Sequence, residues 1–188
     1  MDEQEVLQRF AAELLDKRHH IVANRAADQI VDQSGIYAIH ALEGDCIPSS
    51  FCQYLTARNH RCLYIGKAVQ GLRRLVRYDL NGGGPSTFFC SLGVTLGYRP
   101  VPGSLVGKKD QNNFTFSTDD SKKLAAWSSA HLAVAWRRLE KTSVDALEAP
   151  LIEFIKPLLN IVHNPARLPE LERLRRDARA TARGTDRS

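Results

Sequence analysis

The sequence predicts an α+β fold, in which a small antiparallel sheet of about three strands is flanked by helices. Three observations predict this class. The apolar, β-prone segments are short, few and far apart along the chain. Between them, apolar residues recur at helical spacing. The chain of 188 residues, 43% hydrophobic and 25% charged, has the size and composition of one globular domain with elaborated ends.

We expect three parts along the chain. Residues 1–33 are predicted to form an N-terminal helical extension, and residues 34–163 a central domain that holds the sheet. Residues 164–188 are predicted to form an Arg-rich C-terminal arm, charged and helical in character.

The first elements are expected to be a helix and then a strand. Apolar residues within 3–18 share one face of a helix, and a polar stretch follows. The run 34–42 is apolar and β-prone, which predicts a buried strand. The loop-like stretch 44–50 ends in two serines that are expected to cap a short helix. A second strand is predicted over 61–67.

The middle of the chain is predicted to be helical. Residues 71–80 place leucines and a valine on one helix face and arginines on the other. The Asn-Gly-Gly-Gly-Pro stretch at 81–85 must end that helix, and Ser86 or Thr87 is expected to cap the next one. Residues 97–113 contain several Gly and Pro and are expected to form an irregular surface loop.

The last elements of the central domain are expected to be a helix, a strand and a helix. The Ser-Thr pair at 117–118 is expected to cap a helix over 119–130, which begins with acidic residues. Residues 131–139 are predicted to form a third strand. The last helix is expected over 143–156, where Pro150 should cause a kink.

Basic residues are concentrated in two parts of the chain. The net charge is +5 and the pI is near 9.2, which favours a polyanionic partner only mildly. We expect the C-terminal arm to follow phosphates without regard to sequence; the alternatives are a charged helix docked on the domain or a disordered tail. The two basic groups are Arg58, Arg61, Lys67, Arg73, Arg74 and Arg77, and Arg167, Arg173, Arg175, Arg176, Arg179 and Arg183.

The sequence also excludes some classes. No stretch approaches the roughly 18 consecutive apolar residues of a membrane span, and the acidic N-terminus does not resemble a secretory leader. We therefore expect a cytoplasmic protein with no membrane partner. The cysteines form no C-x-x-C pair, so free thiols are expected rather than a zinc site. The four cysteines are Cys46, Cys52, Cys62 and Cys90.

Two tripeptides stand on the first two predicted strands. They are Gly35-Ile36-Tyr37 and Tyr64-Ile65-Gly66, and Lys67 follows directly. One such tripeptide carries little information, whereas the pair, in this order and on two strands, is much more specific. With this pair the sequence resembles the GIY-YIG nuclease superfamily.

The resemblance extends further along the chain. Arg74 stands ten positions after Tyr64 on the following helix, and Glu148 precedes an apolar run that leads to Asn160, twelve positions later. This interval, and the 27 positions between the two tyrosines, are similar to the restriction-enzyme branch of the family. Tyr78 matches a tyrosine of the excision-repair branch. The resemblance covers about residues 34–161.

The resemblance implies metal-dependent hydrolysis of phosphodiester bonds. Tyr37 is expected to take the proton of the attacking water, with Tyr64 positioning that water or sharing the proton. Arg74 and Lys67 are expected to meet the negative charge of the phosphate oxygens. Glu148 is expected to bind one divalent ion, with Mg²⁺ preferred over Mn²⁺.

Further residues are expected to support the site or to contact nucleic acid. Asn160 is expected to fix the glutamate helix or its loop by hydrogen bonds. Sequence specificity must come from outside the core, where Asn112 and Asn113 lie in a loop that could either reach a groove or be merely solvated. The residues expected on nucleic acid are Arg73, Arg77, Tyr78, Lys108 and Lys109.

Each of these residues also has an ordinary structural interpretation. The tyrosines could be strand aromatics, the arginines a solvated helix face, Glu148 a surface charge and Asn160 a helix C-cap. Their common order and spacing favour a site over these alternatives. Asp79, like Glu43 and Asp45, is expected at the surface.

Two positions depart from related restriction-type nucleases. Those enzymes tend to place a histidine after the helix arginine and an arginine in the next helix, where this chain has Asp79 and Phe89-Cys90. Arg77 or Arg99 could supply the missing positive charge. The departures leave open a catalytically degenerate module that only binds nucleic acid.

The sequence thus predicts a DNA endonuclease that acts on double-stranded DNA, in a restriction or phage-defence setting rather than in repair. A homodimer on DNA is an open expectation, because one active site cuts one strand at a time. The alternatives are the binding module and an RNA-directed nuclease.

Overall fold

The computed structural model describes residues 2–42 and 47–184 and has the predicted α+β fold. Its sheet has four antiparallel strands in the order β1-β4-β2-β3, one more than the sequence predicted. The strands are β1 (Ile21–Val22), β2 (Gly35–Ala41), β3 (Cys62–Ala68) and β4 (Leu132–Arg138). The sequence did not predict β1, because two residues are too few to show the alternating pattern of a strand.

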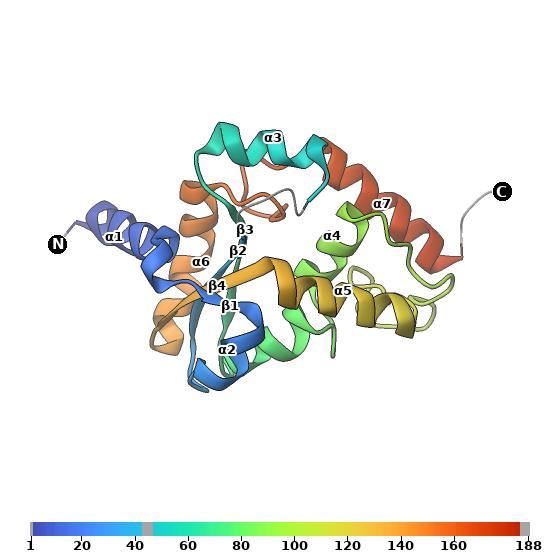
Figure 1. Cartoon of the computed structure of the whole chain (residues 1–188), viewed down its shortest axis with the longest axis horizontal. Helices are drawn as coiled ribbons and strands as arrows, with labels where there is room; N and C mark the ends of the chain where they lie inside the picture. Colours follow the sequence, from blue (N-terminus) through green and yellow to red (C-terminus); the bar gives the residue numbers. More distant parts are fainter. Residues whose placement is uncertain (1, 43–46, 185–188) are drawn as a thin grey trace.

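The sheet divides the core into two layers (Figure 1). Strand β2 is buried along its whole length, because it lies between β3 and β4 and has helices on both faces. α1 (Glu3–Leu15) and α6 (Lys141–Ile155) cover one face. The other face packs against the remaining helices, which are α2 (Ala23–Gln29), α3 (Ser49–Arg58), α4 (Thr87–Thr95), α5 (Thr118–His131) and α7 (Pro169–Arg183).

The predicted helix over 71–80 takes an unusual form. Its second part is a π-helical turn, η2 (Leu75–Leu80), and Leu72 and Leu75 are buried at its base. Such turns widen a helix and often occur near functional sites. A 3₁₀ turn, η1 (Lys17–His19), follows α1, and α2 lies in the polar stretch of the predicted N-terminal helical extension.

The predicted helix caps are confirmed at two positions and wrong at one. Ser86 accepts a hydrogen bond from the backbone N–H of Phe89 at the start of α4, and Ser117 does the same for Asp120 at the start of α5. α3 begins at Ser49 after Pro48, and neither serine at 49–50 caps it. The expected loop over 44–50 falls partly outside the described residues.

Pro150 lies on the exposed side of α6, which continues from Lys141 to Ile155 without a break. The helix ends at Lys156, which adopts a left-handed conformation (φ 56°) just before Pro157. Cys52, Cys62 and Cys90 are free thiols, as predicted, and Cys46 lies outside the described residues. Within the described residues, no helix is long and apolar enough to cross a membrane.

The C-terminal arm forms a helix that docks on the domain, which is the alternative to the expected arm that follows phosphates. The apolar side of α7 joins the core, and its Arg175 is only 2% exposed. The Arg175 guanidinium donates to the backbone oxygen of Asn112 (2.8 Å) and lies 5.0 Å above the Phe114 ring. The segment over 97–113 is irregular, as predicted. It is not a free surface loop, because α7 contacts it and Leu105 is buried.

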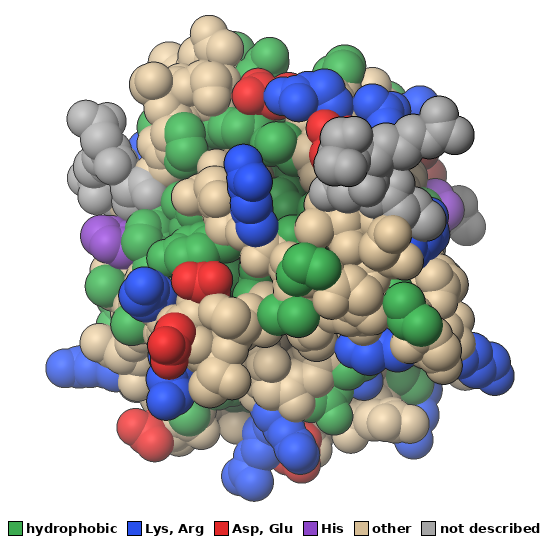
Figure 2. Space-filling model, turned by 90° about the vertical axis from the view of Figure 1, so that its right-hand side faces the viewer, with side chains coloured by type: hydrophobic (Ala, Val, Ile, Leu, Met, Phe, Trp, Pro, Cys, Tyr) green, Lys and Arg blue, Asp and Glu red, His purple; other side chains and the backbone are tan. Residues whose placement is uncertain are grey.

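Acidic side chains pair with part of the positive charge of the C-terminal arm. Figure 2 shows the right-hand side of Figure 1, where Lys and Arg side chains are interspersed with acidic, hydrophobic and uncharged groups. Part of the tail's positive charge is also used internally, since Arg167 pairs with Glu172 (3.1 Å) and Arg173 with Asp177 (3.4 Å).

Candidate active site

Tyr37 and Tyr64 lie on neighbouring strands and point to the same face of the sheet. In the β2–β3 register, Tyr37 is opposite Gly66 and Ile39 is opposite Tyr64, so the two tyrosines are staggered by one pair. Tyr37 is 5% exposed and Tyr64 is half-buried. The face is the one that α4 covers, where the Tyr64 and Phe88 rings lie 5.4 Å apart.

The two motif glycines are required by close approaches. A Cβ at Gly66 would lie 2.5 Å from the Tyr37 hydroxyl oxygen and 2.9 Å from the Tyr64 ring. A Cβ at Gly35 would lie 2.2 Å from the backbone oxygen of Arg137 on β4. Gly66 therefore leaves room for the Tyr37 side chain, and Gly35 lets β4 approach β2.

A buried carboxylate stands behind Tyr37. The Tyr37 hydroxyl donates a hydrogen bond to Oδ2 of Asp79, and the Ser86 hydroxyl donates to Oδ1 of the same carboxylate. Asp79 is 8% exposed and comes from η2, so the expectation that Asp79 lies at the surface is wrong. The helical spacing contained the signal, because position 79 falls on the same helix face as Leu72 and Leu75.

Burial controls the ionisation of these groups. It raises the pKa of Tyr37 well above the usual value, and the negative charges of Asp79 and Glu148 add to this effect. Burial also raises the pKa of Tyr64, again with contributions from Asp79 and Glu148. The pKa of Asp79 is raised by burial, although its hydrogen bonds from Ser86 and Tyr37 and the charge of Arg74 oppose the shift. Both tyrosines are therefore neutral phenols at neutral pH.

Lys67 and Glu148 form an ion pair at the edge of the site. Lys67 Nζ lies 2.9 Å from Glu148 Oε2 and 2.8 Å from Asp145 Oδ1, and these bonds raise the pKa of Lys67. Asp145 was missed by the sequence reasoning, although it lies three residues before Glu148, on the same side of α6. Lys67 stands three residues after Tyr64 on β3, so the ion pair places Glu148 beside the strand of the second motif, on the face that α6 covers.

The arginines of the helical segment over 71–80, called the motif helix below, are exposed, and two of them stack on Tyr78. The Arg74 guanidinium carbon lies 4.7 Å from the Tyr78 ring centroid, and that of Arg77 lies 5.6 Å from it. The charge of Arg74 lowers the pKa of Asp79, which stands five residues further along the same helical segment. Arg73 is exposed on the same turn. These cations therefore lie at the solvent side of the site.

Asn160 joins the segment after α6 to the outer edge of β3. Its side-chain oxygen accepts from Ile65 N–H (2.8 Å), and its side-chain nitrogen donates to the Ile65 oxygen (2.9 Å). The N–H groups of Leu158 and Leu159 also donate to β3, at Cys62 and Leu63. Asn160 thus ties the chain that follows Glu148 to the strand of the second motif.

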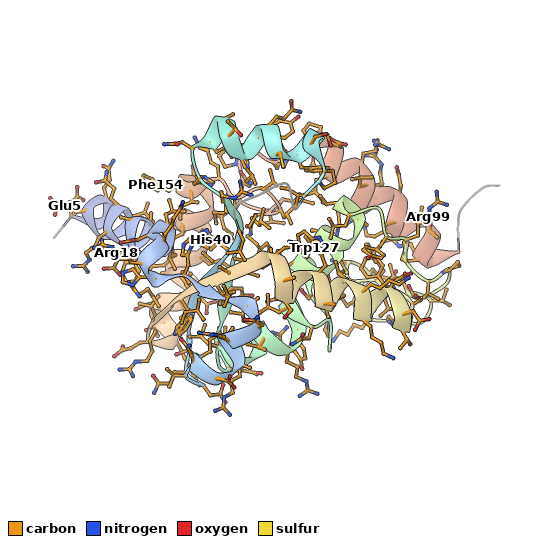
Figure 3. The ribbon with its side chains drawn as sticks, viewed as in Figure 1. Glu5, Arg18, His40, Arg99, Trp127 and Phe154 are labelled. Atoms are coloured by element: carbon orange, nitrogen blue, oxygen red, sulfur yellow. The ribbon has the colours of Figure 1, made fainter. Side chains whose placement is uncertain are left out.

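Several residues singled out from the sequence lie elsewhere. Lys108 and Lys109 are exposed on the loop that α7 anchors. Arg99 lies beside α7 at the end of the molecule opposite α1 (Figure 3), so it cannot supply the missing charge. Phe89 is 5% exposed and packs in the core, which rules out its position as a cation site.

The residues present suit a divalent ion of the Mg²⁺ type. Glu148 Oε2 is a hard oxygen donor that already holds a cation, the Lys67 ammonium, and Asp145 offers a second carboxylate nearby. Within residues 2–42 and 47–184, no group of three or more His, Cys, Asp and Glu side chains could hold a metal ion. Mg²⁺ is commonly held by one or two carboxylates, with water and substrate phosphate completing its coordination.

The fold and this site define a nuclease-type protein: Tyr37 and Tyr64 share one sheet face, the Asp79 carboxylate accepts from Tyr37, and Lys67 of the same sheet pairs with Glu148 on the face that α6 covers. The model of the GIY-YIG catalytic domain matches residues 35–179, from the first motif into α7. The chain therefore belongs to the GIY-YIG catalytic domain family, whose nucleases generally use divalent metal ions. No curated protein and no solved structure matches the chain. The branch of the family and the domain boundaries stay predictions.

Proposed function

We propose that this protein is a divalent-metal-dependent endonuclease that hydrolyses phosphodiester bonds in double-stranded DNA, with Mg²⁺ or Mn²⁺ as the metal. The observation that carries the proposal is that neighbouring strands set Tyr37 and Tyr64 on one sheet face, while Lys67 at the end of the second of these strands lies 2.9 Å from Glu148 of α6. A restriction or phage-defence role, a cytoplasmic location and a homodimer on DNA remain part of the proposal.

In the proposed reaction, Tyr37 accepts the proton of the attacking water, and Tyr64 orients that water. Because both are neutral phenols, Tyr37 can take this proton only as it gives up its own. Arg74, which Tyr78 holds by stacking, donates to the phosphate oxygens as their charge grows.

Glu148 and Lys67 serve the metal and the phosphate. Glu148 would hold the ion, which when bound supplies Lewis-acid polarisation of the phosphate. Lys67 then keeps Asp145 as its partner (2.8 Å) and directs its positive charge toward the phosphate. Asn160 fixes β3 and the chain after α6 relative to each other.

Plasmid cleavage with Mg²⁺ and with Mn²⁺ tests the proposal. We expect the wild type to nick or cut the plasmid, EDTA to stop it, and Tyr37→Phe and Glu148→Gln each to slow it by about 100-fold or more. Matched controls are Tyr54→Phe, on α3, and Glu153→Gln, exposed one turn further along α6, which should cleave normally.

The outcomes separate the alternatives. Unchanged cleavage by Tyr37→Phe and Glu148→Gln would refute the assignment of the site. Binding of DNA or RNA without cleavage by the wild type would favour the degenerate module. Cleavage of matched RNA but not DNA would favour the RNA-directed nuclease.

A further inference from the structure

Ser86, Asp79 and Tyr37 form one buried chain of hydrogen bonds. The Ser86 hydroxyl donates to Asp79, and Asp79 accepts the hydroxyl proton of Tyr37 on its other oxygen. Ser86 is itself fixed, because it accepts from Phe89 N–H (2.9 Å) at the start of α4. Tyr37 is thereby held with its proton directed at Asp79 and its oxygen lone pairs free to accept another proton.

Asp79 is costly to bury. Its exposed fraction is 8%, and among the described residues no Lys, Arg or His makes an ion pair with it. A buried carboxylate without an ion pair is destabilising even when it is hydrogen-bonded. A neutral side chain could accept the hydrogen bond from the Tyr37 hydroxyl with a smaller loss of stability. The presence of a carboxylate at this position therefore indicates that it acts as a base.

We propose that Asp79 is a positioning residue and proton acceptor that acts through Tyr37 during phosphodiester hydrolysis; this inference rests on the proposed nuclease function. As the water oxygen attacks phosphorus, the water O–H bond breaks and its proton passes to the Tyr37 oxygen. The proton of Tyr37 moves at the same time to Oδ2 of Asp79. The P–O bond to the leaving oxygen breaks with its electron pair, and that oxygen takes a proton from solvent.

The surrounding charges set the pH range in which Asp79 can act. Among the described residues, the charged and titratable groups that act on Asp79 or on Tyr37 are Arg74 on the motif helix, Tyr64 on β3 and Glu148 on α6. Asp79 accepts a proton only while ionised. Because burial raises its pKa above the usual 3.8, the cleavage rate should fall as the pH is lowered toward that raised pKa.

Asp79→Asn keeps the shape of the side chain and removes the base. The Asn oxygen can still accept from Tyr37, and its NH₂ can donate to the Ser86 oxygen. We expect a folded protein that binds DNA as the wild type does, with single-turnover cleavage slowed by about 100-fold or more at saturating Mg²⁺. Asp177→Asn, an exposed change on α7, is the matched control and should cleave normally.

The dependence of the cleavage rate on pH distinguishes this role from a purely structural one, which would leave that dependence unchanged. The decline toward low pH that depends on Asp79 should vanish in Asp79→Asn. In Ser86→Ala it should move to higher pH, because the hydrogen bond from Ser86 lowers the pKa of Asp79. Asp79→Asn should add little to the loss in a Tyr37→Phe background, since Asp79 acts through Tyr37.

Three results would overturn the inference. One is a wild-type rate and pH profile in Asp79→Asn; a second is an unshifted profile in folded Ser86→Ala. The third is full additivity of the Asp79→Asn and Tyr37→Phe losses. A wild type that cleaves no nucleic acid would instead refute the proposed function, and this inference with it, so the two failures are distinguishable.

Discussion

Replacing Asn160 by Ala tests how the chain after α6 is joined to β3. Asn160 is 5% exposed and makes two hydrogen bonds to the backbone of Ile65, at 2.8 and 2.9 Å. In Asn160→Ala both Ile65 groups lose these partners at the outer edge of the sheet. Each unsatisfied buried group costs about 1–3 kcal/mol, which gives a loss of about 2–6 kcal/mol in the free energy of unfolding.

Denaturant and thermal unfolding measure this loss. In a protein of this size the midpoint should fall by about 2–4 °C for each kcal/mol, and water that enters at the sheet edge would keep the loss near its lower limit. Asn112→Ala, an exposed change on the anchored loop, is the control and should stay within about 0.5 kcal/mol of the wild type. A loss as small in Asn160→Ala would refute the structural role given to Asn160.

Three further predictions concern the site. Arg74→Lys should slow cleavage at least about 10-fold with little change in stability, because Lys provides neither the fork of donors nor the stacking on Tyr78; Arg73→Lys on the same turn should slow cleavage less. Gly66→Ala should lower the thermal midpoint and the activity together, since its Cβ would meet the Tyr37 hydroxyl; overpacking of this kind costs about 1–3 kcal/mol. Because the pKa of Asp79 is raised, the wild type loses stability as the pH rises through that pKa. The stability of Asp79→Asn relative to wild type should therefore be greater at pH 7 than near pH 4. An equal difference at both pH values would contradict the burial of a charged carboxylate.

The strands of the motifs were predictable because each has a strong local signal. β2 is a continuous apolar run, as expected of a strand that is covered on both faces, and β3 carries the second motif. The caps at Ser86 and Ser117 were predictable for the same reason, since a side chain bonds a backbone group three residues away. β1 was not, because its two residues are held only by pairing with β4.

The buried half of the site depended on contacts that a linear pattern does not show. Asp79 was read as a surface residue because acidic side chains rarely lie in a core without a partner. Its partners, Tyr37 and Ser86, come from β2 and from the turn before α4, and only the tertiary fold brings them together. The docking of α7 was uncertain for a similar reason, since its many arginines hide the buried position of Arg175.

The hydrogen bonds at position 79 explain why a carboxylate fits there. Two hydroxyl donors, from Tyr37 and Ser86, converge on position 79. A neutral histidine has one acceptor nitrogen and could satisfy only one of them, whereas a carboxylate has two oxygens and satisfies both. A carboxylate at position 79 therefore satisfies both hydroxyls and places a base next to Tyr37. Arg74 then remains the arginine whose charge reaches this pair, which is why its substitution should affect cleavage more than that of Arg73.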